Sequence, residues 1–297
     1  MSNERRSVFG WLRGKMRNSA QHQITSRDVS FAAPDSVTVF GTLCEVRNAR
    51  IMAILMHGIT TDRNEYLDFY KDLADHLAQH QISSLRFDFR GHGTSKEKQT
   101  TFSPIGQVLD LVGAVNFLND RSDLSRARLV AFGTSFGAGP AIFTSKFRSG
   151  TFSRLYLLAP VLDYEMTFLK PRTNWAREYF TNKALAAAYK NGSLKLDQFD
   201  VGVRALAEMN LLNPAATAKE LEALPIRIVH GEADSMVPID QSETLSRLVP
   251  NISLLKMPGM DHGFNASGDD EGTDPRSLQN RAKIFEDFVS FVESDDA

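Results

Sequence analysis

Short runs of consecutive apolar residues recur along the chain, separated by stretches in which apolar and polar residues follow a helical period. An unbroken apolar run bounded by turn residues is typical of a strand buried on both faces. The strands predicted in this way span residues 51–56, 84–89, 129–132, 155–159, 226–229 and 252–256. The helical period predicts helices within residues 67–78, 105–118, 241–248 and 284–292.

This alternation predicts an α/β fold. Strands that alternate with helical segments of about a dozen residues are joined by crossovers, so the central sheet should be mostly parallel with helices on both faces. In such sheets ligands collect at the carboxyl ends of the strands. The polar motifs of this chain follow directly after predicted strands, so they should lie at one edge of the sheet.

Two regions depart from the alternation. Residues 36–46, with Gly41 near their centre, predict a hairpin. Residues 163–220 are rich in aromatic residues and helix formers, and they predict a helical cap inserted over the strand ends. The α/β core would then comprise residues 31–162 and 221–297. Aromatic residues at these spacings are usual in helix packing, but an insertion here should also supply part of a pocket wall.

Residues 1–30 form a basic N-terminal extension in which Phe9 and Trp11 stand among arginines and lysines. Such a segment can make a weak contact with a membrane surface. Gly10 and Gly14 disfavour the helix which that role would need. A flexible leader is the favoured alternative.

Composition excludes several classes of protein. A net charge of −2 provides no general attraction for nucleic acid. The single cysteine, Cys44, excludes an intrachain disulfide or a cysteine metal cluster and suits a reducing compartment. Cys44 lies in the early hairpin, far from any base, and is expected to pack inertly. No apolar run is long enough for a membrane span or a secretory signal, so the expected location is the cytoplasm.

The stretch Gly133-Thr134-Ser135-Phe136-Gly137 follows a predicted strand and precedes a segment that can be helical. The spacing G-x-S-x-G in that setting is typical of a nucleophile elbow, a sharp turn that projects the serine hydroxyl above the sheet. Small residues beside the serine let the backbone double back without a clash. The alternative is a glycine-rich turn with an ordinary serine.

A serine hydroxyl needs a base, and the base needs an orienting group. Asp234 and His262 each follow a predicted strand downstream of Ser135. The order Ser, Asp, His is the order that this strand-turn-helix arrangement uses. Asp234 could instead cap the segment after it.

Residues 36–293 resemble an α/β-hydrolase. The motifs that carry the resemblance are His57-Gly58, the elbow at residues 133–137, Gly231-x-x-Asp234-x-x-Val237-Pro238 and Asp261-His262, supported by the glycine-rich turn at residues 90–95. The chain is most similar to small esterases of the cinnamoyl (feruloyl) esterase and monoacylglycerol lipase kind. Residues 57–59 lack the extra glycines of the HGGG type, which argues against bulky tertiary-alcohol esters.

The resemblance implies that Ser135 is the nucleophile, His262 the general base and Asp234 its orienting acid. The backbone N–H groups of Ile59 and Phe136 would form the oxyanion hole. Asp163 is the alternative acid, and Asp261 is expected to be a loop residue. His57, His92 and His230 are expected to hold their own turns. His22, His76 and His80 are expected to be solvated.

The sequence therefore predicts a serine hydrolase that cleaves a small acyl or aryl ester, or a thioester, through an acyl-enzyme, without cofactor or metal. One alternative is an acyltransferase or thioesterase for carrier-bound acyl groups. Another is a ligand-binding protein with little turnover. A third is a peptidase, which an acidic patch for a free amino terminus would favour. The fold does not separate these functions, and the oligomeric state stays open.

Overall fold

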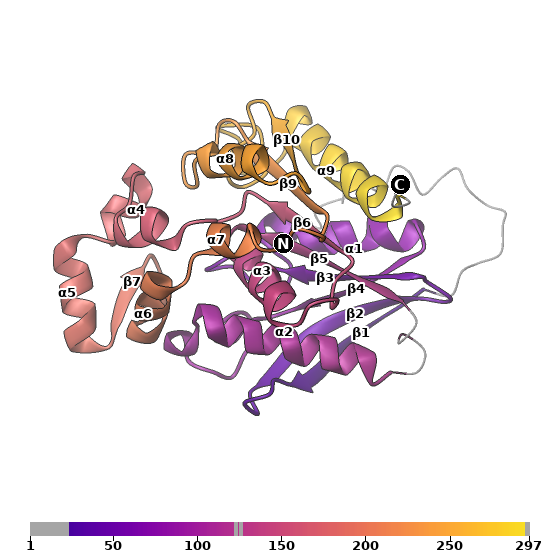
Figure 1. The fold of residues 1–297 in the computed structure, drawn as a ribbon, viewed down its shortest axis with the longest axis horizontal. Coiled ribbons are helices and arrows are strands. Elements are labelled where there is room, and N and C mark those ends of the chain that lie inside the picture. Colours follow the sequence, from indigo (N-terminus) through magenta and orange to yellow (C-terminus); the bar gives the residue numbers. More distant parts are fainter. Residues whose placement is uncertain (1–23, 122–123, 125–126, 295–297) are drawn as a thin grey trace, which may run out of the picture.

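The computed structural model describes residues 24–294, apart from residues 122–123 and 125–126. Their centre is an eight-stranded sheet in the order β1-β2-β4-β3-β5-β6-β9-β10 (Figure 1). Its strands are β1 (Ile24–Ala32), β2 (Thr38–Val46), β3 (Ile51–Met56), β4 (Ile82–Phe87), β5 (Arg128–Thr134), β6 (Arg154–Leu158), β9 (Ile226–Gly231) and β10 (Ile252–Met257). Strands β4, β3, β5, β6, β9 and β10 run parallel, while β1 and β2 are antiparallel to their neighbours. The predicted α/β-hydrolase fold is thereby confirmed.

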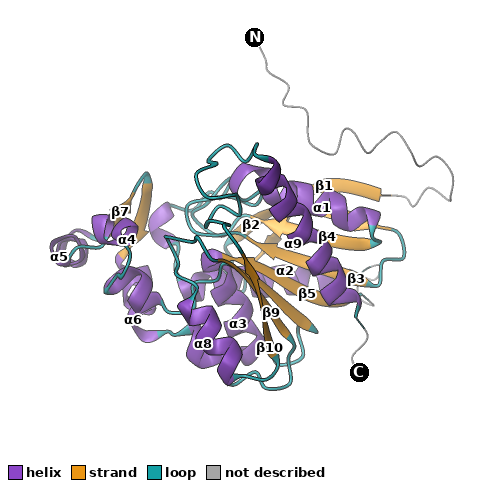
Figure 2. Ribbon diagram, turned by 90° about the horizontal axis from the view of Figure 1, so that it is seen from above, coloured by secondary structure: helices purple, strands orange, loops and turns teal. Residues whose placement is uncertain are grey.

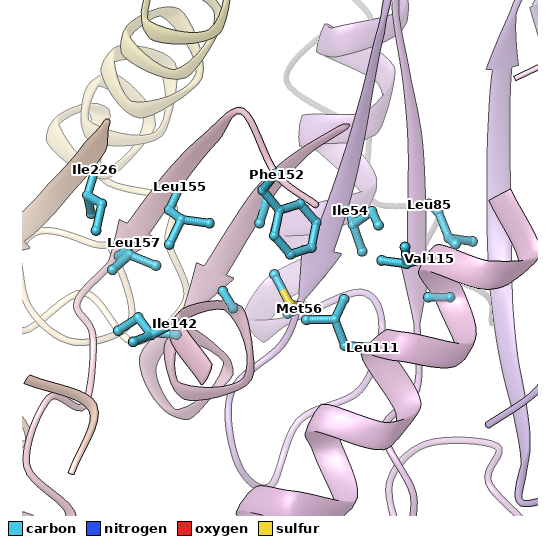
Figure 3. Close-up of a cluster of buried hydrophobic side chains, with 14 of the residues drawn as sticks. Ile54, Met56, Leu85, Leu111, Val115, Ile142, Phe152, Leu155, Leu157 and Ile226 are labelled. Carbon is cyan, nitrogen blue, oxygen red and sulfur yellow. The ribbon is translucent and has the colours of Figure 1, made fainter. Parts of the chain in front are cut away.

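Helices cover both faces of this sheet (Figure 2). Helices α1 (Phe69–Gln79) and α9 (Pro275–Glu293) pack on one face, whereas α2 (Pro104–Asn119), α3 (Ala138–Phe147) and α8 (Asp240–Leu248) pack on the other. Successive residues of β3 alternate between the two cores, with Ile54 and Met56 facing α2 and Ile51 and Leu55 facing α1. Figure 3 shows the core on the face covered by α2 and α3, where side chains of these helices pack against β3, β5 and β6. Burial on both faces explains why the central strands read as unbroken apolar runs.

The N-terminal edge of the sheet differs from the prediction in two ways. Residues 24–30, predicted as part of the extension, belong to β1, and residues 1–23 lie outside the described part of the chain. The chain does not turn at Gly41, which lies inside β2. A Cβ atom at Gly41 would come within 2.8 Å of the Arg86 carbonyl oxygen, so the glycine permits close pairing with β4. Most side chains of β1 are exposed, so the strand has little hydrophobic pattern.

Between β6 and β9 the chain leaves the sheet and forms a lobe at one end of the molecule (Figure 1). Its elements are a π-helical turn (Glu165–Leu169), α4 (Asn174–Tyr179), α5 (Asn182–Asn191), β7 (Ser193–Leu196), β8 (Phe199–Gly202), α6 (Val203–Leu211) and α7 (Pro214–Ala218). We call residues 163–220 the insertion. Its predicted helices are accompanied by the antiparallel hairpin β7–β8, which the sequence did not predict. The two strands are only four residues each, too short to establish an alternating pattern.

The hairpin fastens the insertion to the loop that follows β4. The Asp200 N–H donates to the Gln99 side-chain oxygen at 2.9 Å. Gly202 lies so close to this loop that a Cβ atom would be 2.2 Å from the Thr100 carbonyl oxygen. The Phe199 ring stacks on His92 with ring centroids 4.4 Å apart. The insertion is therefore held at the hairpin as well as at its two chain connections.

Candidate active site

The turn that carries Ser135 is tightly constrained. Ser135 has a φ of 49°, in the left-handed region that non-glycine residues rarely adopt. A Cβ atom at Gly133 would lie 2.6 Å from the Gly137 carbonyl oxygen, and one at Gly137 would lie 2.3 Å from the Met56 carbonyl oxygen. Both glycines are thus required by close backbone contacts, as expected for the predicted elbow. Helical structure begins at Ser135 and continues into α3.

The structure brings Ser135, His262 and Asp234 together in one hydrogen-bonded chain. The distance from Ser135 Oγ to His262 Nε2 is 3.0 Å, and His262 Nδ1 lies 2.7 Å from Asp234 Oδ2. Because the carboxylate oxygen can only accept, Nδ1 carries a proton and Nε2 is left to accept from the serine hydroxyl. This is the arrangement that a base needs in order to activate a serine.

Asp234 is held as a carboxylate. Its Oδ1 accepts from the N–H groups of Met236 at 2.9 Å and Val237 at 2.8 Å. Burial acts to raise the pKa of Asp234, but His262 and His230 outweigh it and hold the pKa well below its usual range. For His262 burial acts to lower the pKa, yet Asp234 raises it above the ordinary histidine value of 6.5. The pair therefore favours an ionised acid beside a basic imidazole.

Direct packing of two loops sets the position of Asp234 relative to His262. A Cβ atom at Gly231, which ends β9, would lie 2.1 Å from the Met260 carbonyl oxygen in the loop after β10. The same carbonyl accepts from the Ala233 N–H at 3.1 Å. The loop after β9 thereby lies directly on the loop that presents His262.

The two N–H groups predicted to form an oxyanion hole flank Ser135. Phe136 is the second residue of the helical segment, and the first N–H groups of a helix have no partner within it. Ile59 follows Gly58 in the loop after β3 and lines the same pocket as Ser135. A Cβ atom at Gly58 would lie 3.3 Å from Ser135 Cβ, so this loop passes directly beside the serine.

The sequence-based prediction missed Glu65. This residue is 9% exposed and lines the pocket beside Ser135. Its Oε2 accepts from the Gly58 N–H at 2.7 Å and from the Thr134 hydroxyl, and its Oε1 accepts from the Tyr66 N–H at 3.0 Å. Glu65 stands in a polar loop with no motif around it, so the one available signal was its place shortly after His57-Gly58.

A pocket of about 460 Å³ opens over Ser135 and His262. One part of its wall is apolar and includes Phe168 and Trp175 of the insertion together with Val161 and Met236. Another part of the lining is acidic. Its carboxylates come from Glu65, Asp261 and Asp270, and the described lining includes no lysine or arginine.

The remaining candidates take other roles. Asp163 accepts from the Met166 N–H at 2.9 Å and from the Asn213 side chain at 3.3 Å, not from His262. Asp261 accepts from the Asn265 N–H within its own loop, as predicted. Cys44 is buried in β2 beside Val46 and Ala78.

Three histidines hold loops, as predicted. His57 accepts at Nε2 from the Phe89 N–H at 3.0 Å, so its Nδ1 donates to the Gly58 carbonyl oxygen at 2.7 Å. His230 bridges the Ser242 hydroxyl and the Val237 carbonyl oxygen at 2.8 Å each. His92 contacts the Arg90 carbonyl oxygen at 3.2 Å. His22 lies outside the described residues.

The prediction that His76 is solvated was wrong. The His76 side chain is covered by α9, where its ring packs on Phe285, and the residue is 7% exposed. With His80 and Glu286 it forms a group of possible metal ligands, the one such group found among the described residues. This group shares no residue with the pocket that contains Ser135.

None of the described helices is both long and apolar enough to cross a membrane.

Solved structures share the fold at low sequence identity. Est1E from Butyrivibrio proteoclasticus, solved with ferulic acid bound, superposes with a TM-score of 0.69 at 17% identity, covering 90% of this chain and 100% of that chain. The esterase Pf2001 from Pyrococcus furiosus gives a TM-score of 0.62 at 19% identity, with 89% of each chain covered.

Sequence relatives are similarly distant. The 2-(acetamidomethylene)succinate hydrolase of Mesorhizobium japonicum is 24% identical over 241 residues, which cover 72% of this chain and 82% of the relative. The uncharacterized protein YfhR of Escherichia coli K12 is 28% identical over 191 residues, or 64% of this chain. The matched region spans little more than half of YfhR, 56% of its length.

Residues 47–265 match the model of the serine aminopeptidase S33 family, and they contain the Ser135 turn, Asp234 and His262. The chain therefore belongs to the serine aminopeptidase S33 family of α/β-hydrolases.

Proposed function

We propose that this protein hydrolyses a carboxylic ester through an acyl-enzyme formed on Ser135. The observation that carries the proposal is the hydrogen-bonded chain from Ser135 through His262 to Asp234 at the base of a pocket with an apolar wall. Pf2001, one of the solved structures with this fold, is an esterase, and Est1E was solved with ferulic acid bound, which supports the same class of reaction.

In the first half of the reaction, Ser135 Oγ attacks the carbonyl carbon while its proton passes to His262 Nε2. The carbonyl oxygen becomes an oxyanion, and the N–H groups of Ile59 and Phe136 would stabilise it. Asp234 stabilises the imidazolium that forms. Collapse of the intermediate breaks the ester C–O bond, and the departing alkoxide takes the proton from His262.

In the second half, water attacks the acyl carbon and gives its proton to His262. The second tetrahedral intermediate then expels Ser135 Oγ, which recovers the proton, and the free acid leaves. The acyl or aryl group would lie against Phe168 and Trp175, so we propose that the insertion acts as a cap that contributes to acyl selectivity. The same steps would serve a thioester, or transfer the acyl group to another alcohol or thiol.

The acidic wall favours a second candidate function. Three carboxylates near the nucleophile would attract the free amino terminus of a peptide, so aminopeptidase activity is the alternative for this site. Hydrolysis of alanine p-nitroanilide faster than that of p-nitrophenyl acetate would favour it over the esterase proposal.

The first prediction concerns Ser135. Hydrolysis of p-nitrophenyl esters from acetyl to myristoyl should be measurable, and Ser135→Ala should lower kcat by at least about 10,000-fold because the nucleophile is lost. Ser145→Ala is the matched control, because Ser145 is buried in α3 and its hydroxyl bonds to the Ala141 carbonyl oxygen. Equal turnover by native protein and Ser135→Ala would refute the assignment of the nucleophile. No turnover by either would favour the ligand-binding or carrier-dependent alternatives.

The second prediction concerns pH. His262 must be neutral to accept the serine proton, and its pKa is raised, so kcat/KM should increase with pH and reach half its maximum above pH 6.5. A profile of kcat/KM from pH 5 to 9 with two different leaving groups checks this. A midpoint clearly below 6.5 with both substrates would contradict the described electrostatics of His262.

The third prediction concerns substrate charge. The carboxylates of the pocket should repel an anionic acyl group, so kcat/KM for p-nitrophenyl hemisuccinate should be about tenfold or more below that for p-nitrophenyl butyrate. The difference should shrink at 0.5 M salt, at which charges in open pockets are partly screened. Equal kcat/KM for the two esters at low salt would show that the acidic wall does not influence selectivity.

A further inference from the structure

Glu65 combines an unusual backbone with a buried carboxylate. Its φ of 61° and ψ of 177° lie in a region that is essentially restricted to glycine. Such a conformation is costly and persists only when surrounding contacts fix it. The contacts in this case are the three hydrogen bonds that the carboxylate accepts, from the Gly58 and Tyr66 N–H groups and the Thr134 hydroxyl.

These contacts join the two backbone segments beside the pocket. Thr134 directly precedes Ser135, and Gly58 directly precedes Ile59. The carboxylate of Glu65 therefore ties the turn of the serine to the loop that carries the other predicted oxyanion-hole donor. The Thr134 hydroxyl also lies 3.2 Å from the buried Tyr70 hydroxyl, which donates to the Met56 carbonyl oxygen at 2.8 Å.

The peptide group between Gly58 and Ile59 is held on its other side. Its carbonyl oxygen accepts from His57 Nδ1 at 2.7 Å and from the Thr61 hydroxyl at 3.1 Å. In a trans peptide the C=O and N–H bonds point in opposite directions. Fixing the Gly58 carbonyl, together with the Gly58 N–H held by Glu65, therefore fixes the direction of the Ile59 N–H.

We infer that Glu65 is a positioning residue that orients the Ile59 N–H for the oxyanion formed when Ser135 attacks. This inference rests on the proposed function. Glu65 acts through Gly58 and Thr134, and it donates no proton in the reaction. Its role explains why a costly backbone conformation is kept beside the nucleophile.

The test is Glu65→Gln, which preserves the size of the side chain. A glutamine has one acceptor oxygen in place of two. If that oxygen replaces Oε1, the bonds from Gly58 and Thr134 are lost, and if it replaces Oε2, the amide NH₂ group opposes the Tyr66 N–H and displaces the side chain. We expect kcat to fall about 10- to 100-fold with KM changed less than about threefold, because an oxyanion-hole donor acts mainly in the transition state. Asp287→Asn is the matched control. Asp287 of α9 pairs with Arg227 of β9, and neither residue lines the pocket, so the loss of this charge should affect stability and leave kcat unchanged.

The pH profile gives a readout that a merely structural role would not change. The carboxylates that face His262 are Asp234, Asp261 and Glu65. Neutralising Glu65 removes one charge that favours the imidazolium, so the acid limb of kcat/KM should move to lower pH. Native kcat and an unchanged acid limb in Glu65→Gln would overturn the inference while the esterase proposal stands. Absence of ester turnover in the native protein would refute the proposed function itself.

Glu65→Gln could fail to fold. In that case Thr134→Val tests the same tie, because it removes the hydroxyl that donates to Glu65 and leaves Gly58 in place. A lower kcat with little change in KM would support the inference, and a native kcat would overturn it.

An independent observation concerns the packing of α1 against α9. His76 lies in the last turn of α1, His80 follows this helix as its C-cap residue, and Glu286 of α9 lies beside His76. One ligand atom from each of the three side chains lies within 4.8 Å of the other two.

His76 Nε2 is buried and has no hydrogen-bond partner among the residues that the structure describes. The nearest carboxylate oxygen, Oε1 of Glu286, is 3.7 Å away, which exceeds hydrogen-bond length. The rings of Phe285 and His80 pack against the His76 ring, with centroids 5.6 and 4.6 Å away. A buried polar atom without a partner calls for an explanation such as an ion.

We propose that His76, His80 and Glu286 bind a transition-metal ion such as Zn²⁺, with water completing a tetrahedral shell. Two imidazoles and a carboxylate suit this ion, whose bonds of about 2.0–2.2 Å place neighbouring ligand atoms about 3.3 Å apart. Glu286 is exposed and His80 is partly exposed, so both can move by the small distance required. The metal would join α1 to α9 on the sheet face opposite α3, away from the pocket.

The test uses the full chain after treatment with EDTA. Adding ZnCl₂ should raise the thermal midpoint by a few degrees. Adding CoCl₂ should give a visible spectrum typical of tetrahedral Co²⁺ at one equivalent. Both effects should be lost in His80→Ala and Glu286→Gln and kept in Glu293→Gln, a control that alters another carboxylate of α9. Equal binding by native protein and His80→Ala, or no stoichiometric binding, would overturn the proposal.

Discussion

The close contact between the serine turn and the end of β3 is the constraint on which the site depends. Gly137 lies against the Met56 carbonyl oxygen with no room for a Cβ atom, and Gly58 lies directly beside Ser135, where a Cβ atom would make a tight contact of 3.3 Å with Ser135 Cβ. These contacts place a residue of positive φ at the carboxyl edge of the sheet and bring the loop after β3 beside its hydroxyl. The strain at Ser135 is offset by the buried strands on both sides.

Asp234 and His262 reach this serine from the far half of the sheet. Their loops follow adjacent parallel strands, and Gly231 lets one loop pack on the other. Two backbone N–H groups donate to one oxygen of Asp234, and His262 Nδ1 donates to the other oxygen. The backbone therefore fixes the orientation of the carboxylate, and the carboxylate in turn orients the imidazole ring. Because the carboxyl ends of parallel strands lie at one edge of the sheet, residues distant in the sequence come together there in one row of hydrogen bonds.

Features that depend on the residues next to them in the sequence, such as a turn after a buried strand, could be predicted from the sequence. Ser135, Asp234 and His262 were identifiable because each follows a buried strand and carries its own turn motif. Glu65 was not, because its importance comes from contacts with Gly58 and Thr134 that no spacing reveals. Strand β1 escaped prediction because its side chains are mostly exposed, and the burial of His76 depends on α9, far away in the sequence.

The hairpin of the insertion has a consequence for how this protein can diversify. Gln99 and Asp200 fasten the lobe to the loop after β4, while Phe168 and Trp175 of the same lobe line the pocket. Ser135, Asp234 and His262 all follow strands of the central sheet and lie outside the insertion. Mutations in the insertion can therefore reshape the apolar part of the pocket without moving Ser135 or His262. Substitutions that change the shape of the pocket can thus accumulate in the insertion during evolution, while the hydrogen-bonded chain of Ser135, His262 and Asp234 stays the same.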